Sequence, residues 1–240
     1  MLWIRLGLSC LLTVGVAGSI AYILLRLYDT FRRNRNPYVI MQGQKLGFVL
    51  YWLPFPFMLT CVSRLQYASS AWLVTGEFIC ARSSAVTSPF IMLGCIWLVG
   101  FGASILWICY RQRRLTVTWR GNVPLEQEEL LELFEEYKEC FGISKVELYQ
   151  NDLLKSPVTY GTWRYKIVVP YARYTKKQFR MILEHEMNHI LSGDLQWRKL
   201  GLLTLMMHWY NPIVYVQLKY LILQQEIVCD MKAGMRNDWY

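Results

Sequence analysis

Residues 176–193 read KKQFRMILEHEMNHILSG, and this stretch decides the fold of the C-terminal half of the chain. Thr175 in front of it is a good helix N-cap, and Gly193 suits a helix C-terminus, so the pattern predicts a helix from Lys176 to about Ser192. His185 and His189 are four residues apart, which is about one helical turn. The stretch therefore predicts a helix that presents two imidazoles on one face.

The two histidines belong to an H-E-x-x-H motif, whose chemistry is that of a zinc site. Glu186 follows the first histidine and reaches the water on the metal rather than the metal, where it can act as general base. The alternative is an amphipathic helix with two incidental histidines. Against it, the three histidines of the chain all fall between residues 185 and 208. We therefore expect bound Zn²⁺, with His185 and His189 as ligands and Glu186 as catalytic base.

A catalytic zinc site usually has a third protein ligand, and the downstream candidates are Asp194, His208, Glu226 and Asp230. Glu226 and Asp230 lie one turn apart on an otherwise apolar helix, where a buried acid needs a partner. We favour Glu226 as the third ligand and expect Asp230 and Asp194 to orient ligand histidines. His208 directly precedes a helix break, so we expect it to support the site or the fold, with zinc ligation as the alternative.

Short strands and one further helix precede the histidine helix. Residues 145–149 alternate as a strand, and Val158–Tyr160, Gly161 and Tyr165–Val169 predict a hairpin. Pro124–Cys140 predicts an amphipathic helix with seven glutamates on its polar faces, and Leu115–Gly121 predicts a strand-like run or linker. We expect a strand of the hairpin to bind an extended substrate by strand addition. The alternative is that the hairpin only covers the apolar side of the histidine helix.

The N-terminal half has the composition of a membrane region. The chain of 240 residues is 54% hydrophobic and 18% charged, which disfavours a disordered chain or an ordinary soluble domain. Eleven of the 26 Lys and Arg residues, but two of the 17 Asp and Glu residues, lie in residues 1–114. The net charge of +9 thus belongs to the hydrophobic half, and we expect no direct binding of nucleic acid.

Three apolar runs predict membrane spans at residues 6–25, 46–62 and 89–110. Basic residues follow the first run, so we interpret it as a retained anchor rather than a cleaved signal peptide. Pro54 and Pro56 predict a kink in the second span. Eight Lys and Arg residues flank the spans on one side and three on the other, which predicts an outer N-terminus and a cytoplasmic C-terminal half.

These features predict a membrane α+β protein, with a transmembrane region at 1–114 and a cytoplasmic metallopeptidase domain at 115–240. The apolar stretch 200–223 cannot be a single crossing if His185 and Glu226 share one ion, because about 30 Å of hydrocarbon would separate them. We expect instead two helices bent at Asn211-Pro212 that return to the same side, lying in the membrane interface. Among the seven cysteines, Cys61 and Cys80 could form a disulfide on the outer side, but we favour the alternative that they stay reduced.

Several motifs together resemble the BlaR/MecR-type antibiotic-sensor metallopeptidases. They occur in that family's order and approximate spacing: Ser156-Pro-Val-Thr-Tyr-Gly161, Ile167-Val-Val-Pro170, Ile182-Leu-Glu-His-Glu-Met-Asn-His189, Asp194, His208-Trp-Tyr-Asn-Pro212 and Glu226-x-x-x-Asp230. The resemblance implies a membrane-embedded gluzincin with a cytoplasmic zinc site. It also implies signal transduction by regulated proteolysis, in which the chain cleaves itself and a transcriptional repressor is lost.

The chain departs from that family in one respect. Residues 1–240 contain no Ser-x-x-Lys and no Lys-Thr-Gly, the motifs of a penicillin-binding domain. We expect no direct β-lactam sensing by these residues, and a signal from a longer chain, a homodimer partner or a separate sensor subunit. The expected activity is zinc endopeptidase cleavage of a peptide or protein at a bacterial cell membrane. The alternatives are a non-catalytic signalling scaffold with structural zinc and a quality-control protease for membrane proteins.

Overall fold

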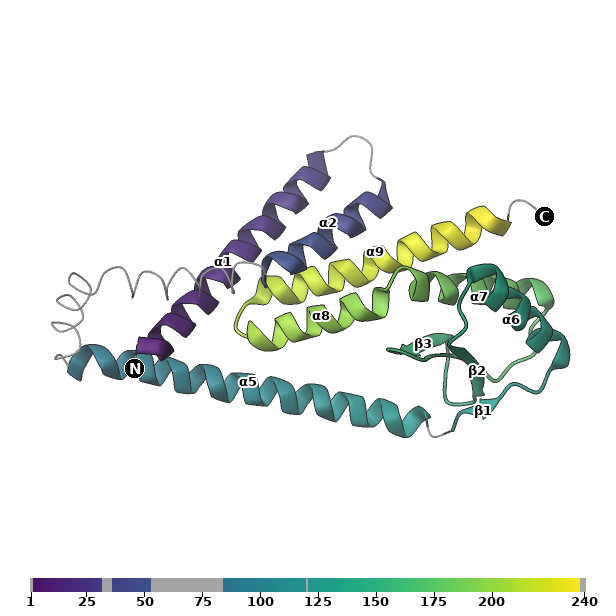
Figure 1. Cartoon of the computed structure of the whole chain (residues 1–240), viewed down its shortest axis with the longest axis horizontal. Helices are drawn as coiled ribbons and strands as arrows, with labels where there is room; N and C mark the ends of the chain where they lie inside the picture. The colour runs from purple at the N-terminus through teal and green to yellow at the C-terminus, as the bar shows by residue number, and fades with distance from the viewer. Residues whose placement is uncertain (1, 32–35, 53–83, 120, 238–240) are drawn as a thin grey trace. The chain divides into compact units, whose positions relative to one another are not determined.

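The computed structural model describes residues 2–31, 36–52, 84–119 and 121–237, which form two compact units (Figure 1). Unit 1 comprises 1–107 and 201–219, and unit 2 comprises 108–200 and 220–240. The chain therefore passes between the units within three helices. The elements are α1 (Leu2–Phe31), α2 (Pro37–Leu50), α5 (Ser84–Trp119), β1 (Val123–Pro124), α6 (Glu128–Phe141), β2 (Val146–Asn151), β3 (Val158–Gly161), β4 (Tyr165–Pro170), α7 (Lys176–Leu191), α8 (Asp194–Met207) and α9 (Pro212–Asn237).

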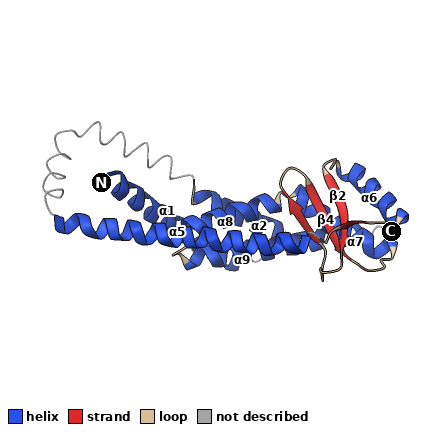
Figure 2. Ribbon diagram, turned by 90° about the horizontal axis from the view of Figure 1, so that it is seen from below, coloured by secondary structure: helices blue, strands red, loops and turns tan. Residues whose placement is uncertain are grey.

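Unit 2 contains a small mixed sheet with the strand order β1-β2-β4-β3 (Figure 2). β2 and β4 run parallel, with Leu148 opposite Ile167. β3 and β4 form the predicted antiparallel hairpin, with Thr159 opposite Ile167. Gly161 begins its turn at φ +124°, and a Cβ there would collide with the carbonyl oxygen of Arg164, so the turn requires glycine. In this order β3 is an edge strand.

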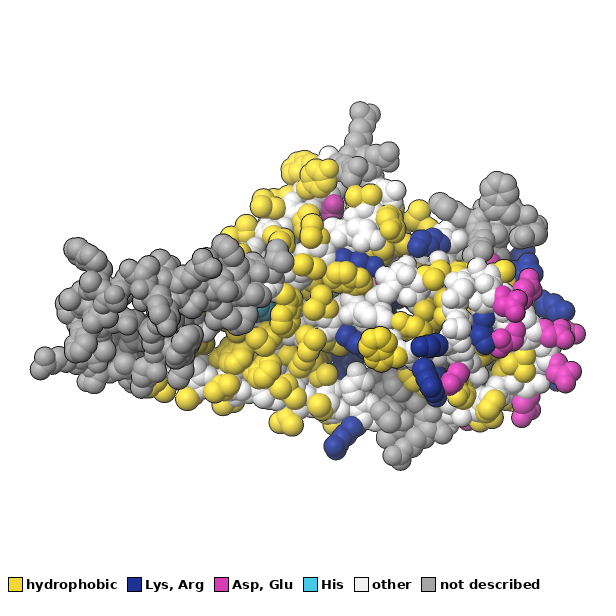
Figure 3. All heavy atoms as spheres, viewed as in Figure 1, with side chains coloured by type: hydrophobic (Ala, Val, Ile, Leu, Met, Phe, Trp, Pro, Cys, Tyr) yellow, Lys and Arg dark blue, Asp and Glu magenta, His cyan; other side chains and the backbone are white. Residues whose placement is uncertain are grey.

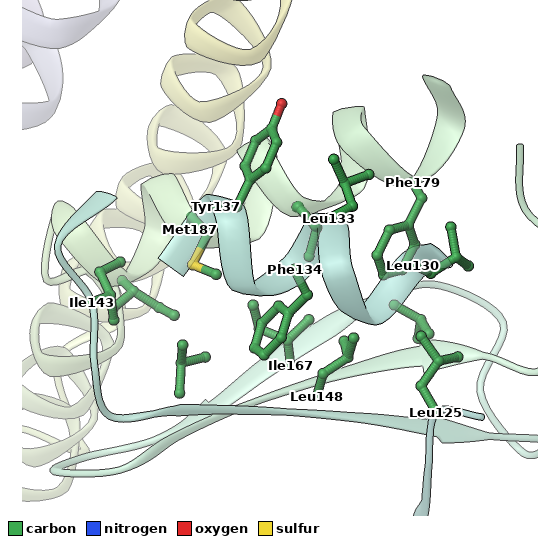
Figure 4. Close-up of a cluster of buried hydrophobic side chains, with 14 residues drawn as sticks. Leu125, Leu130, Leu133, Phe134, Tyr137, Ile143, Leu148, Ile167, Phe179 and Met187 are labelled. Carbon is green, nitrogen blue, oxygen red and sulfur yellow. The ribbon is translucent and has the colours of Figure 1, made fainter. Parts of the chain in front are cut away.

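The core of unit 2 lies between this sheet and the helices α6 and α7 (Figure 4). Alternate residues of β2 and β4 face the helices, as the period of two in a strand requires. Helix α6 contributes Leu130, Leu133, Phe134 and Tyr137 at helical spacing, and the α7 residues Phe179, Leu183 and Met187 are fully buried. Packing of α7 on the sheet fixes the direction in which its histidine face points.

The predicted ends of α7 are confirmed. The Thr175 side chain accepts from the backbone N–H of Gln178, and the Gln178 side chain accepts from the Thr175 N–H, which is a capping box. After α7, Gly193 has φ +64°, so the chain leaves the helix in the left-handed conformation. Helix α8 begins at once with Asp194.

In the described part of the chain, two helices are long and apolar enough to cross a membrane: Cys10–Phe31 in α1, and Ile91–Arg114 in α5, which continues from unit 1 into unit 2. They overlap the first and third predicted spans. Large apolar side chains of α5 are exposed, for example Val99 and Leu106. The second predicted span is not confirmed, because α2 ends at Leu50 and residues 53–62 lie outside the described part of the chain. Pro54, Pro56, Cys61 and Cys80 also lie outside it.

The predicted bend at Asn211-Pro212 is confirmed: α8 ends at Met207 and α9 begins at Pro212. The two helices run side by side as an antiparallel pair (Figure 1). Pro212 occupies the first helical position, and Asn211 Oδ1 accepts from the backbone N–H of Ile213 at 3.0 Å. The predicted position of this pair in the membrane interface, and the predicted domain boundary at residue 114, remain predictions.

Two predicted elements differ from the structure. Residues 115–119 continue α5 rather than forming a strand, since residues 103–119 contain no glycine or proline that would end the helix. Helix α6 begins at Glu128 rather than Pro124, because Val123 and Pro124 pair with β2 as β1. Its glutamates are exposed, and Figure 3 shows acidic side chains gathered over the α6 end of unit 2.

Candidate metal centre

Three atoms that could bind one metal ion lie close together between α7 and α9 within unit 2. His185 Nε2 and His189 Nε2 are 3.1 Å apart, and Glu226 Oε2 lies 3.5 Å from the first and 3.6 Å from the second. A tetrahedral zinc ion with bonds of about 2.0–2.1 Å places its ligand atoms roughly 3.3 Å apart. The triangle formed by these atoms therefore fits one zinc ion.

The other nitrogen of each imidazole faces a carboxylate. His189 Nδ1 lies 2.9 Å from Asp194 Oδ2, and His185 Nδ1 lies 2.9 Å from Asp230 Oδ1. A neutral imidazole that donates Nδ1–H to a carboxylate keeps the lone pair on Nε2 for a metal. Asp194 and Asp230 thus lie where the sequence analysis expected groups that orient the histidines.

The two oxygens of Glu226 have different partners. Oε2 faces the histidines, whereas Oε1 accepts a hydrogen bond of 2.6 Å from Arg198 Nη2. Arg198 Nε in turn donates to Gln225 Oε1 at 2.8 Å. Because the guanidinium occupies one oxygen, it favours binding of a metal by the other oxygen alone.

Glu186 is buried and its carboxylate contacts β3. Thr159 Oγ1 donates to Glu186 Oε2 at 2.5 Å. Both residues line a cleft of about 530 Å³, which also exposes the histidines, Glu226, Arg198 and the apolar side chains of Val158, Met181, Ile182 and Leu195. The cleft thus lies beside the edge strand β3.

At this centre, contacts between Glu226 and the two histidines shift the pKa values of all three residues towards the charged forms. A hydrogen bond with Glu226 is the main cause of a raised pKa of His185, against the opposing effect of burial. Burial also lowers the pKa of His189, but hydrogen bonds with Asp194, Cys229 and Glu226 outweigh it and the net shift is upward. The same contacts with His185 and His189 hold the pKa of Glu226 well below its ordinary value.

His208 is not part of this cluster. It belongs to unit 1, where its ring packs against Tyr51 with centroids 5.3 Å apart and its Nδ1 lies 3.3 Å from the Tyr210 hydroxyl. Among the residues that the structure describes, the side-chain groups that could hold a metal ion do not include it. These contacts fit a structural role better than ligation.

Three residues that contact the centre have no role among the predictions from sequence: Thr159, Arg198 and Cys229. Cys229 Sγ lies 3.3 Å from His189 Nδ1 and 3.8 Å from Asp194 Oδ2. Arg198 follows Asp194 by four residues, so helical periodicity could have placed it on the same face of α8. Cys229 follows Glu226 by three residues, so helical periodicity gives the same signal on α9. Thr159 carries no such signal, because its contact with Glu186 depends on the packing of β3 beside α7.

The family profile described as BlaR1 peptidase M56 matches residues 77–236. Regulatory protein BlaR1 of Bacillus licheniformis is 28% identical over 138 residues, which are 56% of this chain and 23% of that protein. The methicillin resistance mecR1 protein of Staphylococcus aureus is 25% identical over 149 residues, which are 58% of this chain and 24% of that protein. The chain thus spans about a quarter of the length of these relatives.

Proposed function

Because the chain belongs to the BlaR1 peptidase M56 family, we propose that it is an integral-membrane zinc endopeptidase that cleaves protein segments at the cytoplasmic face of the membrane. One observation carries this proposal. Two imidazole nitrogens and one carboxylate oxygen lie within 3.6 Å of one another at a cleft that also contains the buried carboxylate of Glu186. A structural site needs no carboxylate base beside its ligands, whereas a hydrolytic site does.

Each side chain at the centre has a role in the proposed hydrolysis of a peptide bond. His185, His189 and Glu226 would hold a zinc ion, which would lower the pKa of water and polarise a carbonyl group. Glu186 accepts the proton of the attacking water at a carboxylate oxygen and passes it to the leaving nitrogen. The Thr159 hydroxyl holds one oxygen of Glu186, which leaves the other oxygen for the water.

The substrate backbone binds along β3. An edge strand presents N–H and C=O groups that can pair with another extended segment, and β3 borders the cleft. A bond within a helix or a folded domain cannot reach the metal centre, so the substrate must present an extended segment. Backbone pairing recognises few side chains, so specificity depends largely on which segments reach the cleft.

The physiological substrate is either the chain itself or a second protein, with a transcriptional repressor as the regulatory candidate. Both fit a signal-transducing peptidase whose activating signal comes from a homodimer partner, a separate sensor subunit or a longer chain. The orientation of basic residues supports an outer N-terminus and a cytoplasmic unit 2. A quality-control protease would use the same zinc chemistry. The proposed peptidase differs from it because its cleavage transmits a signal.

Purified wild type and Glu186→Gln test the proposal together. Wild type should cleave itself or candidate peptides in a reaction that a chelator stops, and Glu186→Gln should bind one zinc and cleave nothing. If both bind zinc and neither cleaves, the alternative of a signalling scaffold with structural zinc is correct. Comparison of cleavage products in cells with wild type or Glu186→Gln then separates a regulatory peptidase, with one or a few products, from quality control, with many.

A further inference from the structure

The tip of the β3–β4 hairpin carries an exposed tryptophan that the proposed chemistry does not use. Trp163 is 86% exposed, although indole is among the largest apolar side chains. Its neighbours Thr162 and Arg164 are exposed as well. An exposed indole on a tight turn, followed by a cation, is a combination that soluble surfaces seldom need and membrane interfaces favour.

Two side chains of α8 hold this tip in place within unit 2. Lys199 Nζ donates to the Gly161 carbonyl at 2.9 Å and also contacts Thr162 Oγ1. Gln196 Nε2 donates to the Tyr165 hydroxyl at 2.6 Å. The exposed tryptophan therefore stands on a supported turn with a defined direction.

These contacts also tie the hairpin tip to the part of α8 that lies next to the apolar stretch beginning at about residue 200. Two residues after Lys199, at Gly201, α8 passes into unit 1, which contains the candidate membrane helix of α1 and most of that of α5. Two residues of α-helix span only about 3 Å. The tip is therefore attached to the last residues of α8 before the apolar stretch that we expect at the membrane interface.

We propose that the hairpin tip Thr162–Arg164 contacts the bilayer, with the Trp163 indole in the interface and Arg164 against the phosphates of anionic lipid headgroups. Charge supports this partner. Lys166 is already paired with Glu147 at 3.3 Å, while Arg164 and Lys199 add positive charge at the turn. An anionic bilayer surface attracts such cations, and an indole gains by leaving water for the interface.

This contact would orient β3, and with it the proposed cleft, at the membrane surface. Extended segments close to the bilayer would then reach β3 more readily than segments in the bulk cytoplasm. The lipid contact itself does not require peptidase activity, so it can be tested separately from the proposed function.

The test uses the full chain in nanodiscs, with the photoreactive amino acid p-benzoylphenylalanine in place of Trp163. The matched control carries the same probe in place of Tyr171, which is 72% exposed and follows the other end of β4. Six residues of strand separate the two positions by about 20 Å. Discs of phosphatidylcholine alone, and of phosphatidylcholine with phosphatidylglycerol, are irradiated, and adducts are identified by mass spectrometry.

Lipid adducts should form at position 163 and exceed those at position 171, with phosphatidylglycerol adducts in excess. Adding Arg164→Gln should reduce the preference for phosphatidylglycerol about fivefold. As a second measurement on the native side chain, bromine-labelled lipids should quench the part of the tryptophan fluorescence that Trp163→Phe removes. Equal lipid adducts at the two positions, adducts at 163 to protein only, or an unquenched Trp163 would each overturn the proposal.

Discussion

At the scale of single residues, the first prediction concerns the three proposed zinc ligands. His185→Ala, His189→Ala or Glu226→Ala should each abolish cleavage and severely weaken zinc binding, because each removes one corner of the ligand triangle. His208→Ala should retain zinc, since His208 contacts Tyr51 and Tyr210 instead. Zinc content by elemental analysis checks both statements. If His208→Ala loses zinc and Glu226→Ala keeps it, the assignment of Glu226 as the third zinc ligand is wrong.

Arg198 makes the second prediction, because it holds the Glu226 oxygen that faces away from the histidines. Arg198→Gln should weaken zinc binding roughly 10–100-fold, the usual cost of removing a group that orients a ligand. Arg198→Lys should restore part of the loss, since an ammonium group keeps the charge without the fork. Competition with a fluorescent chelator measures the affinity, with Arg173→Gln as an exposed control. Unchanged affinity in Arg198→Gln would exclude this positioning role.

The raised pKa values of His185 and His189 make the third prediction. Protonated histidine stabilises the zinc-free protein at pH values below the unfolded pKa of about 6.5, and this contribution disappears as pH rises through the folded pKa. Zinc binding requires the protons to leave, so zinc stabilises more as pH rises. The gap in unfolding temperature between zinc-loaded and chelated protein should therefore widen from about pH 6 to about pH 8. A constant or narrowing gap would contradict this linkage.

At the scale of elements, the strand order makes a prediction about substrate binding. Val158 and Tyr160 lie in the edge strand β3. We expect Val158→Pro and Tyr160→Pro each to lower cleavage while zinc stays bound, because proline removes a backbone hydrogen-bond donor. Val168→Pro lies in β4, between β2 and β3, so it should instead destabilise the sheet and lower the unfolding temperature. Zinc content, melting and cleavage are measured for all three. If both β3 variants fold, keep zinc and cleave normally, substrate does not add to β3.

At the scale of the whole molecule, the distribution of Lys and Arg makes a prediction about topology. Cys140 is an exposed thiol on α6 of unit 2, which we expect on the cytoplasmic side. A variant that keeps only Cys140 should resist a membrane-impermeant maleimide in intact cells and react in inverted vesicles. A variant that keeps only Cys80, in the predicted outer loop, should show the opposite pattern. Labelling of Cys140 in intact cells would contradict this prediction and would show that unit 2 lies on the outer side of the membrane.

Local sequence patterns were sufficient for the elements that carry the chemistry. Thr175, Gln178 and Gly193 define the ends of α7 by hydrogen bonds within a few residues, so the helix and the shared face of His185 and His189 follow from sequence alone. Glycine at 161 and proline at 212 likewise specify a turn and a helix start. Apolar runs predicted the candidate membrane helices in α1 and α5, because the length and hydropathy of a run are also local properties of the sequence.

Tertiary packing decided what those patterns could not. The sequence offered four candidates for the third ligand, and only the packing of α9 on α7 and α8 brings Glu226 to the histidines and Arg198 to Glu226. The sheet order, which makes β3 the edge beside Glu186, depends on pairing between segments about twenty residues apart. Helix ends and turns are fixed by short-range hydrogen bonds that sequence spacing encodes. Contacts between distant segments arise when apolar faces are buried together, and their geometry exists only in the folded chain.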